Sequence, residues 1–142
     1  MTKKWIRLVS VLGILALQCQ ILFAGNISFT NFTFTTIPYG EALNEVARMN
    51  KEDNEQRWYV TLTGSSGLSS TSERALVVSS RVGSVFEMDA ALVPIRSTTT
   101  SFNAPYHPEC YLQQGTNCML YATGNQNMGI EYTISLSGRY TP

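Results

Sequence analysis

The chain has 142 residues with ten basic and ten acidic side chains, so its formal net charge is zero. A length of this order suits one domain with a modest core. The basic residues do not cluster on a basic domain, and this balance argues against a nucleic-acid-binding protein.

The first residues have the order of a secretory signal peptide. A basic head, formed by Lys3, Lys4 and Arg7, precedes an apolar run at residues 8–17, and the small residue Ala24 follows. We therefore predict that residues 1–24 are a cleaved signal peptide and that the protein is secreted to the extracellular space.

Two other interpretations of this segment stay open. Apolar character resumes at residues 21–24, as in a retained membrane anchor, but a spanning helix needs roughly 20 mostly apolar residues, and Gln18 and Gln20 interrupt this run. Cys19 could carry a lipid, although lipid attachment normally follows a small residue and Gln18 is not small. We expect no stable membrane span after cleavage.

Residues 25–142 are expected to form a single secreted β domain. Removal of residues 1–24 takes away three basic residues and no acidic one, which leaves a net charge of −3. Lys51 is then the only lysine beside six arginines.

Strand patterns begin at residues 27–36, which are rich in Phe and Thr. The apolar residues at positions 27 and 29 are out of phase with those at 32 and 34, so either a bulge lies near Asn31 or both faces of the strand are covered. Next, residues 42, 43, 46 and 47 recur at helical spacing, which predicts one short helix of barely two turns. A charged, solvated loop at residues 50–56 follows.

Alternation is clear at residues 57–63, with Trp58, Val60 and Leu62 on one face. Residues 75–82 predict another strand. Residues 85–93 alternate again, with Glu87 and Asp89 on the face opposite to the one that bears the residues at 86, 88, 90 and 92.

The segment at residues 96–109 is the longest irregular piece, because Pro105 and Pro108 should prevent regular pairing. The cysteine hairpin at residues 110–118 supplies two more strands, the second of which runs through residues 118–123, and a last strand at residues 130–137 completes the set. The whole predicts an all-β fold, an antiparallel β-sandwich of about seven short strands.

Cys110 and Cys118 are separated by seven residues. A redox motif would have two intervening residues, and a zinc site would need four ligands where only these cysteines and His107 are near in sequence. In an oxidising compartment the spacing indicates a disulfide across an odd-length hairpin loop, with Gly115 in the left-handed position.

Candidate catalytic residues are few, and we expect no enzymatic activity, no cofactor and no metal. His107, the only histidine, lies between tyrosine and proline without a serine nucleophile motif. Glu87 and Asp89 share one strand face and could act as paired carboxylates, but a solvated outer face is the interpretation that we prefer.

Tyrosines give the best binding signal, because amphipathic aromatic side chains are common at binding surfaces. The candidate ligand face consists of Tyr59, Tyr106, Tyr111, Tyr121 and Tyr140. Asn26 and Asn31 each begin a sequence that matches the N-glycosylation pattern.

Three short stretches, "RWYVTLTG", "CMLYATGN" and "YTISLSGRYTP", resemble a group of small secreted proteins of Gram-positive bacteria that are catalogued as a domain of unknown function. The residues that carry the resemblance are Trp58, Val60, Leu120, Ala122, Gly138, Tyr140 and Pro142. The resemblance implies an exported β-sandwich, in some members encoded near peptide-export or bacteriocin-like systems, and it brings no catalytic residues.

Together these observations predict a secreted, non-enzymatic binding protein that acts at cell surfaces as an effector or accessory factor. Its partner would be an extracellular or cell-surface protein or a glycan. A glycan- or cell-wall-binding module is the alternative, and a hydrolase that uses Glu87 and Asp89 is a distant one.

Overall fold

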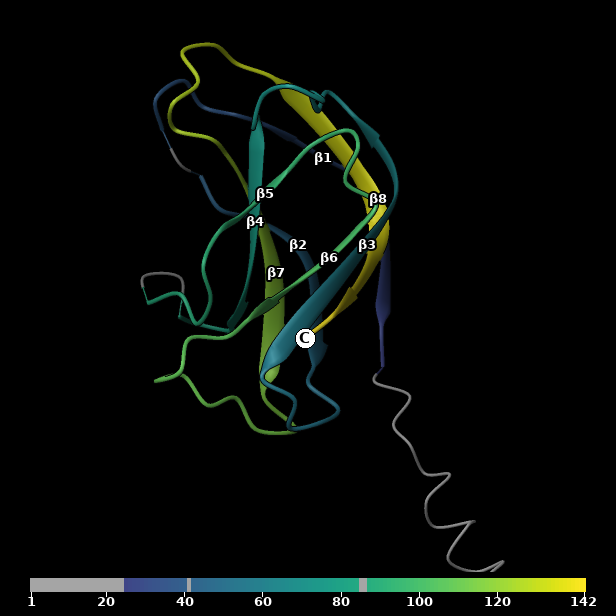
Figure 1. Ribbon diagram of the computed structural model, residues 1–142, viewed down its shortest axis with the longest axis vertical. Helices are drawn as coiled ribbons and strands as arrows, with labels where there is room; N and C mark the ends of the chain where they lie inside the picture. The colour runs from purple at the N-terminus through teal and green to yellow at the C-terminus, as the bar shows by residue number, and fades with distance from the viewer. Residues whose placement is uncertain (1–24, 41, 85–86) are drawn as a thin grey trace, which may run out of the picture.

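Eight strands form two four-stranded antiparallel sheets in the computed structural model, which describes residues 25–40, 42–84 and 87–142 (Figure 1). The predicted all-β sandwich is therefore confirmed. The expected signal peptide at residues 1–24 lies outside the described residues. Sheet A has the order β1-β8-β3-β6 and sheet B the order β2-β7-β4-β5. The strands are β1 (Ile27–Thr35), β2 (Asn44–Asn50), β3 (Arg57–Ser66), β4 (Ala75–Arg81), β5 (Val93–Ile95), β6 (Ser101–Pro105), β7 (Asn117–Gly124) and β8 (Thr133–Thr141).

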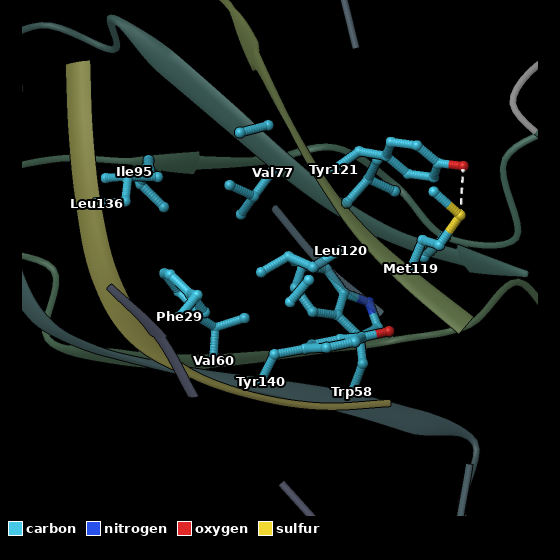
Figure 2. Close-up of a cluster of buried hydrophobic side chains, with 14 of the residues drawn as sticks. Phe29, Trp58, Val60, Val77, Ile95, Met119, Leu120, Tyr121, Leu136 and Tyr140 are labelled. Carbon is cyan, nitrogen blue, oxygen red and sulfur yellow. Dashed lines mark hydrogen bonds between the residues drawn. The ribbon is translucent and has the colours of Figure 1, made fainter. Parts of the chain in front are cut away.

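The core lies between the two sheets (Figure 2). Trp58 and Val60 of β3 project from sheet A, and Leu120 of β7 and Val77 of β4 project from sheet B. Each of these side chains is at most 2% exposed. Because burial of such large apolar side chains contributes about 1.5–3 kcal/mol each, this layer is the main source of stability.

Sheet A follows the sequence pattern closely. In β3 the predicted inward residues Trp58, Val60 and Leu62 are buried, and Ile134 and Leu136 are buried in β8. The bulge expected near Asn31 is confirmed, since the register of β1 against β8 shifts between Phe29 and Phe32 and Asn31 has a φ of 50°. The start of the last predicted strand was wrong, because Ile130 is exposed and β8 begins three residues later.

The short helix predicted at residues 42–49 is wrong, because this segment contains strand β2. Its pairing with β7 shifts between Glu45 and Ala47, so Val46 is an extra, bulged residue. A bulge moves the apolar residues by one position along the strand. The apolar spacing of an amphipathic helix arises here from a strand with a bulge.

The strand predicted at residues 85–93 is also wrong over its described part. Residues 87–92 form only one isolated bridge, between Ala90 and Tyr106, before the short strand β5 begins at Val93. Conversely, the segment predicted to be irregular contains β6, which ends at Pro105. β6 is an edge strand that pairs with β3 alone, and an edge position tolerates a residue without an N–H group.

Within the described part of the chain, no helix has the length and apolar character needed to span a membrane.

Candidate functional site

The five tyrosines of the predicted ligand face do not share a surface. Tyr106, Tyr121 and Tyr140 are at most 5% exposed, whereas Tyr59 is half-buried and Tyr111 is 62% exposed. The three buried members are structural, so these five tyrosines do not form the predicted ligand face.

Two of these tyrosines meet in a buried hydrogen-bond network between the sheets. The Ser79 hydroxyl lies 2.9 Å from the Tyr106 hydroxyl and 2.6 Å from the Tyr140 hydroxyl. Burial raises the pKa of both tyrosines far above the ordinary value of 10.0, so they stay protonated. The Ser79 hydroxyl thus bridges the two tyrosine hydroxyls and connects β4 to β8 in the interior.

The two carboxylates proposed for a hydrolase are separated in the structure. Asp89 is fully buried, while Glu87 is exposed, so the expectation of a shared solvated face is wrong. The Asp89 Oδ2 atom accepts hydrogen bonds from the Ser80 hydroxyl at 2.7 Å, the Arg81 N–H at 2.8 Å and the Ser84 hydroxyl at 2.9 Å.

These contacts determine the charge of Asp89. Burial alone would raise its pKa, but the hydrogen bonds from Arg81, Ser80 and Ser84 and the ion pair with Arg81 at 2.8 Å lower it below 3.8. Asp89 is thus a stable anion, which is the opposite of what a general acid requires. Its carboxylate joins the end of β4 to the loop that follows.

Cys110 and Cys118 are free thiols, and the predicted hairpin between them does not form. The strand predicted at residues 118–123 is confirmed as part of β7. Cys118 starts the buried part of β7, whereas Cys110 lies in a turn in which its N–H donates to the His107 carbonyl at 2.8 Å. The predicted left-handed Gly115 is confirmed by its φ of 88°.

The segment before β7 binds a different part of the chain, which explains the missing hairpin. The Gly115 N–H donates to the Lys51 carbonyl, and the Leu112 N–H and carbonyl both bond to the Gln56 side chain. The backbone groups that a hairpin would have used are therefore satisfied by residues 51–56.

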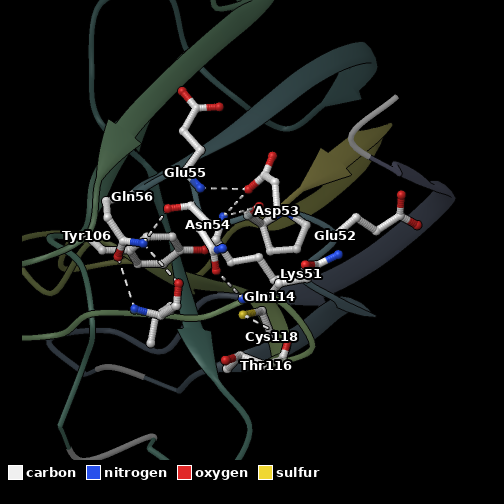
Figure 3. Close-up of polar contacts among 12 residues, drawn as sticks. Lys51, Glu52, Asp53, Asn54, Glu55, Gln56, Tyr106, Gln114, Thr116 and Cys118 are labelled. Carbon is white, nitrogen blue, oxygen red and sulfur yellow. Dashed lines mark hydrogen bonds and ion pairs between the residues drawn. The ribbon is translucent and has the colours of Figure 1, made fainter. Parts of the chain in front are cut away.

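Lys51 is a buried cation that the sequence pattern did not reveal (Figure 3). Its Nζ atom donates to Asp53 Oδ1 at 3.0 Å and to the main-chain oxygen of Pro142 at 2.9 Å, and it lies 5.6 Å from the centre of the Tyr106 ring. An ammonium held by an anion, a carbonyl and a ring is not an available base or nucleophile.

The Cys118 thiol lies in the same cluster (Figure 3). Burial raises its pKa to about 11, although the nearby Tyr106 hydroxyl and Lys51 charge act in the opposite direction. The thiol is therefore unreactive at neutral pH. Among the described residues, no three His, Cys, Asp or Glu side chains converge to hold a metal ion.

The outer face of sheet A is rich in serine and threonine. Many of its outward positions bear short hydroxyl side chains that pair across strands, as Thr33 does with Ser135 and Thr35 with Thr133. We call it the hydroxyl face; it consists of Ser28, Thr33, Thr35, Thr61, Ser101, Thr133, Ser135, Ser137 and Thr141.

A hollow of about 220 Å³ lies on the hydroxyl face. It is lined by Asn31, Gly64, Ser65, Ser66, Ser135 and Ser137, none of which is charged. The sequence did contain a signal for this surface, because Ser and Thr recur at every second position in residues 33–35 and 133–137. We expected tyrosines to form the contact surface and did not assign the hydroxyl residues a role.

Comparison with known proteins assigns the chain to no family. No protein-family model matches the chain, and no curated protein matches it. A solved structure with similarity is that of infectious bursal disease virus, Gt strain, at 15% identity and a TM-score of 0.43. The match covers 82% of this chain but only 30% of that chain.

Proposed function

We propose that the protein is a secreted, non-enzymatic binding protein that acts at cell surfaces and that the hydroxyl face is its contact surface. The observation that carries this proposal is the open outer face of sheet A. Thr33, Thr35, Thr61 and Thr133 are exposed there, on three strands of sheet A that pack on the core beneath them. Binding sites on rigid strands are well defined in geometry.

The state of the ionisable side chains supports a role without catalysis. Asp89 is held as an anion, Lys51 is ion-paired, and the Cys118 thiol is protonated. An acid or base that takes part in catalysis must reach the substrate and change its protonation state near neutral pH.

Binding to cells tests the proposal. We would label the purified protein and compare its binding with that of the single variants Thr61→Arg and Thr133→Arg, which place a bulky charge on the hydroxyl face. Thr98→Arg is the matched control, since Thr98 is an exposed threonine of a loop outside this face. We expect both face variants to lose binding and the control to retain it. Equal binding by all four proteins would contradict the proposal.

Secretion has its own test. Intact-mass analysis of the culture medium should find a chain that starts near Gly25 or Asn26, because the basic head and apolar run are typical of a cleaved signal. Recovery of only full-length, membrane-bound protein would favour the retained anchor instead.

A screen on glycan, ester and peptide substrates tests the absence of enzymatic activity. We expect no turnover. Turnover that the double variant Glu87→Gln, Asp89→Asn abolishes would show that the distant hydrolase alternative is correct.

A further inference from the structure

Two β-bulges meet at one residue of the hydroxyl face. In β1, Thr30 and Asn31 together stand against the single residue Ser137 of β8, between the pairs that Phe29 and Phe32 form. In β3, on the other side of β8, Thr63 is the extra residue between Leu62 and Gly64, and Gly64 pairs with Ser137. Bulges are built features that often lie beside functional sites.

The paired bulges explain the hollow. An extra residue on each flank bends β1 and β3 away from a flat surface, and Gly64 contributes no side chain to fill the space. A Cβ atom added at Gly64 would lie 3.8 Å from the Ser137 Cβ, which is an ordinary van der Waals distance. The chain could accommodate a larger residue there without a clash, so packing alone does not require this glycine.

Asn31 is held in place at the edge of the hollow. Its N–H donates to the Ser137 Oγ at 2.9 Å, and its Oδ1 lies 3.5 Å from the same hydroxyl. Its φ of 50° is uncommon for a residue other than glycine, and such conformations cluster at ligand-binding positions.

Several polar groups of the hollow remain available to a ligand. Among the described residues, the hydroxyls of Ser65, Ser66 and Ser135 and the Nδ2 of Asn31 bond to no other side chain or backbone group. Hydroxyls both donate and accept, and the amide nitrogen has two donors. The hydroxyl groups of a sugar ring need this combination of donors and acceptors.

On these grounds, and resting on the proposed function, we propose that the hollow binds the ring of an uncharged sugar. Its volume is smaller than the roughly 300–1,000 Å³ of pockets for drug-sized ligands, so it has room for one ring. No charged side chain lines it. Arg139 lies one row further along the same face, opposite Ser28 and Thr61, and it is the group that an acidic sugar would use.

The affinity of one hollow for one sugar should be weak. No aromatic side chain lines it, so the stacking that strengthens many sugar sites is missing. A glycan-covered cell surface offers many copies of one sugar, and several weak contacts can then give firm attachment.

The experiment is an NMR titration of ¹⁵N-labelled protein made in a host without N-glycosylation, so that Asn31 is unmodified. The probes are glucose, galactose, mannose, N-acetylglucosamine and, as an acidic sugar, glucuronic acid. We expect a saturable shift of the amide signals of Asn31, Ser65 and Ser137 with at least one of the neutral sugars.

Gly64→Ala should weaken that binding about fivefold or more, because the methyl group narrows the hollow. Thr98→Ala is the control and should bind as the wild type does.

Three results would overturn the inference: no saturable shift with any sugar, equal binding by Gly64→Ala and wild type, or preference for glucuronic acid that Arg139→Gln removes. A cell-binding measurement distinguishes failure of the sugar assignment from failure of the proposed function. If Gly64→Ala binds cells normally while Thr61→Arg does not, the hydroxyl face stands as the contact surface and the sugar assignment is wrong.

Discussion

The outer faces of the two sheets differ in how far they are exposed to solvent. In sheet A the outward residues of the central strands are polar and mostly exposed, as Thr61 and Thr133 are. In sheet B the outward residues Val78, Met119 and Tyr121 are at most 5% exposed, and the Tyr121 hydroxyl donates to the Met119 sulfur at 3.1 Å. In its central strands sheet A therefore has a single buried face and sheet B has two, so a loss of packing should cost more stability in sheet B.

The largest difference in stability between the two sheets is expected when one tyrosine on each sheet is replaced by alanine. Tyr121→Ala should lower the free energy of unfolding by about 3 kcal/mol, because it leaves a cavity at a covered face. Tyr59→Ala on sheet A should cost less than about 1 kcal/mol, since Tyr59 is half-buried and bonds mainly to the exposed Glu55. Urea unfolding of both variants gives the two values. Similar losses would show that the sheets are equally buried.

A smaller effect is expected for the carboxylates beside sheet B. Asp89→Asn should lower the free energy of unfolding by about 2 kcal/mol. The asparagine amide is uncharged, and its NH₂ group cannot accept the hydrogen bonds that Ser80 and Arg81 donate to the carboxylate. Glu87→Gln should stay within about 0.5 kcal/mol of wild type, as exposed substitutions do. Denaturant unfolding at about pH 7 measures both, and a loss in the Glu87 variant as large as that in the Asp89 variant would contradict this structure.

Acid should remove the contribution of Asp89 to the free energy of unfolding. Its folded pKa lies below 3.8, so its contribution is fully present above that pH and is lost as the pH falls through the folded pKa. The stability difference between wild type and Asp89→Asn should therefore shrink when unfolding is measured at successively lower pH below about 4. A difference that stays constant over this range would mean that Asp89 is not charged in the folded protein.

The last prediction concerns the rates at which the two cysteines are alkylated, and it requires no substitution. Cys110 is half-buried and Cys118 fully buried with a pKa of about 11. Alkylation with iodoacetamide, mapped by mass spectrometry, should label Cys110 first and Cys118 only after unfolding. Failure to label either residue in denaturant without a reductant would show that they form a disulfide after all.

Three strands of sheet A, β1, β3 and β8, could be predicted from the sequence for a physical reason, whereas the edge strand β6 was missed. A sheet with one wet face requires alternation of polar and apolar residues, so Trp58, Val60 and Leu62 could be assigned inward from the pattern alone. The bulge at Asn31 was also visible as a break in that alternation.

Sheet B could not be predicted in this way, because a strand buried on both faces does not alternate. Tyr121 therefore looked like a surface residue, and the bulged strand around Val46 looked like a helix. The buried charges were missed for a related reason. Lys51 and Asp89 are ordinary surface residue types. Lys51 is buried against the main-chain oxygen of Pro142, far along the chain, and Asp89 is buried by hydrogen bonds from the end of β4 and the turn after it, and neither contact leaves a mark in the apolar pattern.

The order of the strands also governs when the chain can fold. Sheet A is centred on β8 and sheet B on β7, and these are the last two described strands in the chain. During synthesis from the N-terminus, β1 and β3 have no shared partner until residues 133–141 emerge, and β2 and β4 wait for residues 117–124. Such long-range pairing is slow and leaves strand edges open in the meantime. Neither sheet can therefore be completed before its central strand, β7 or β8, has been synthesised.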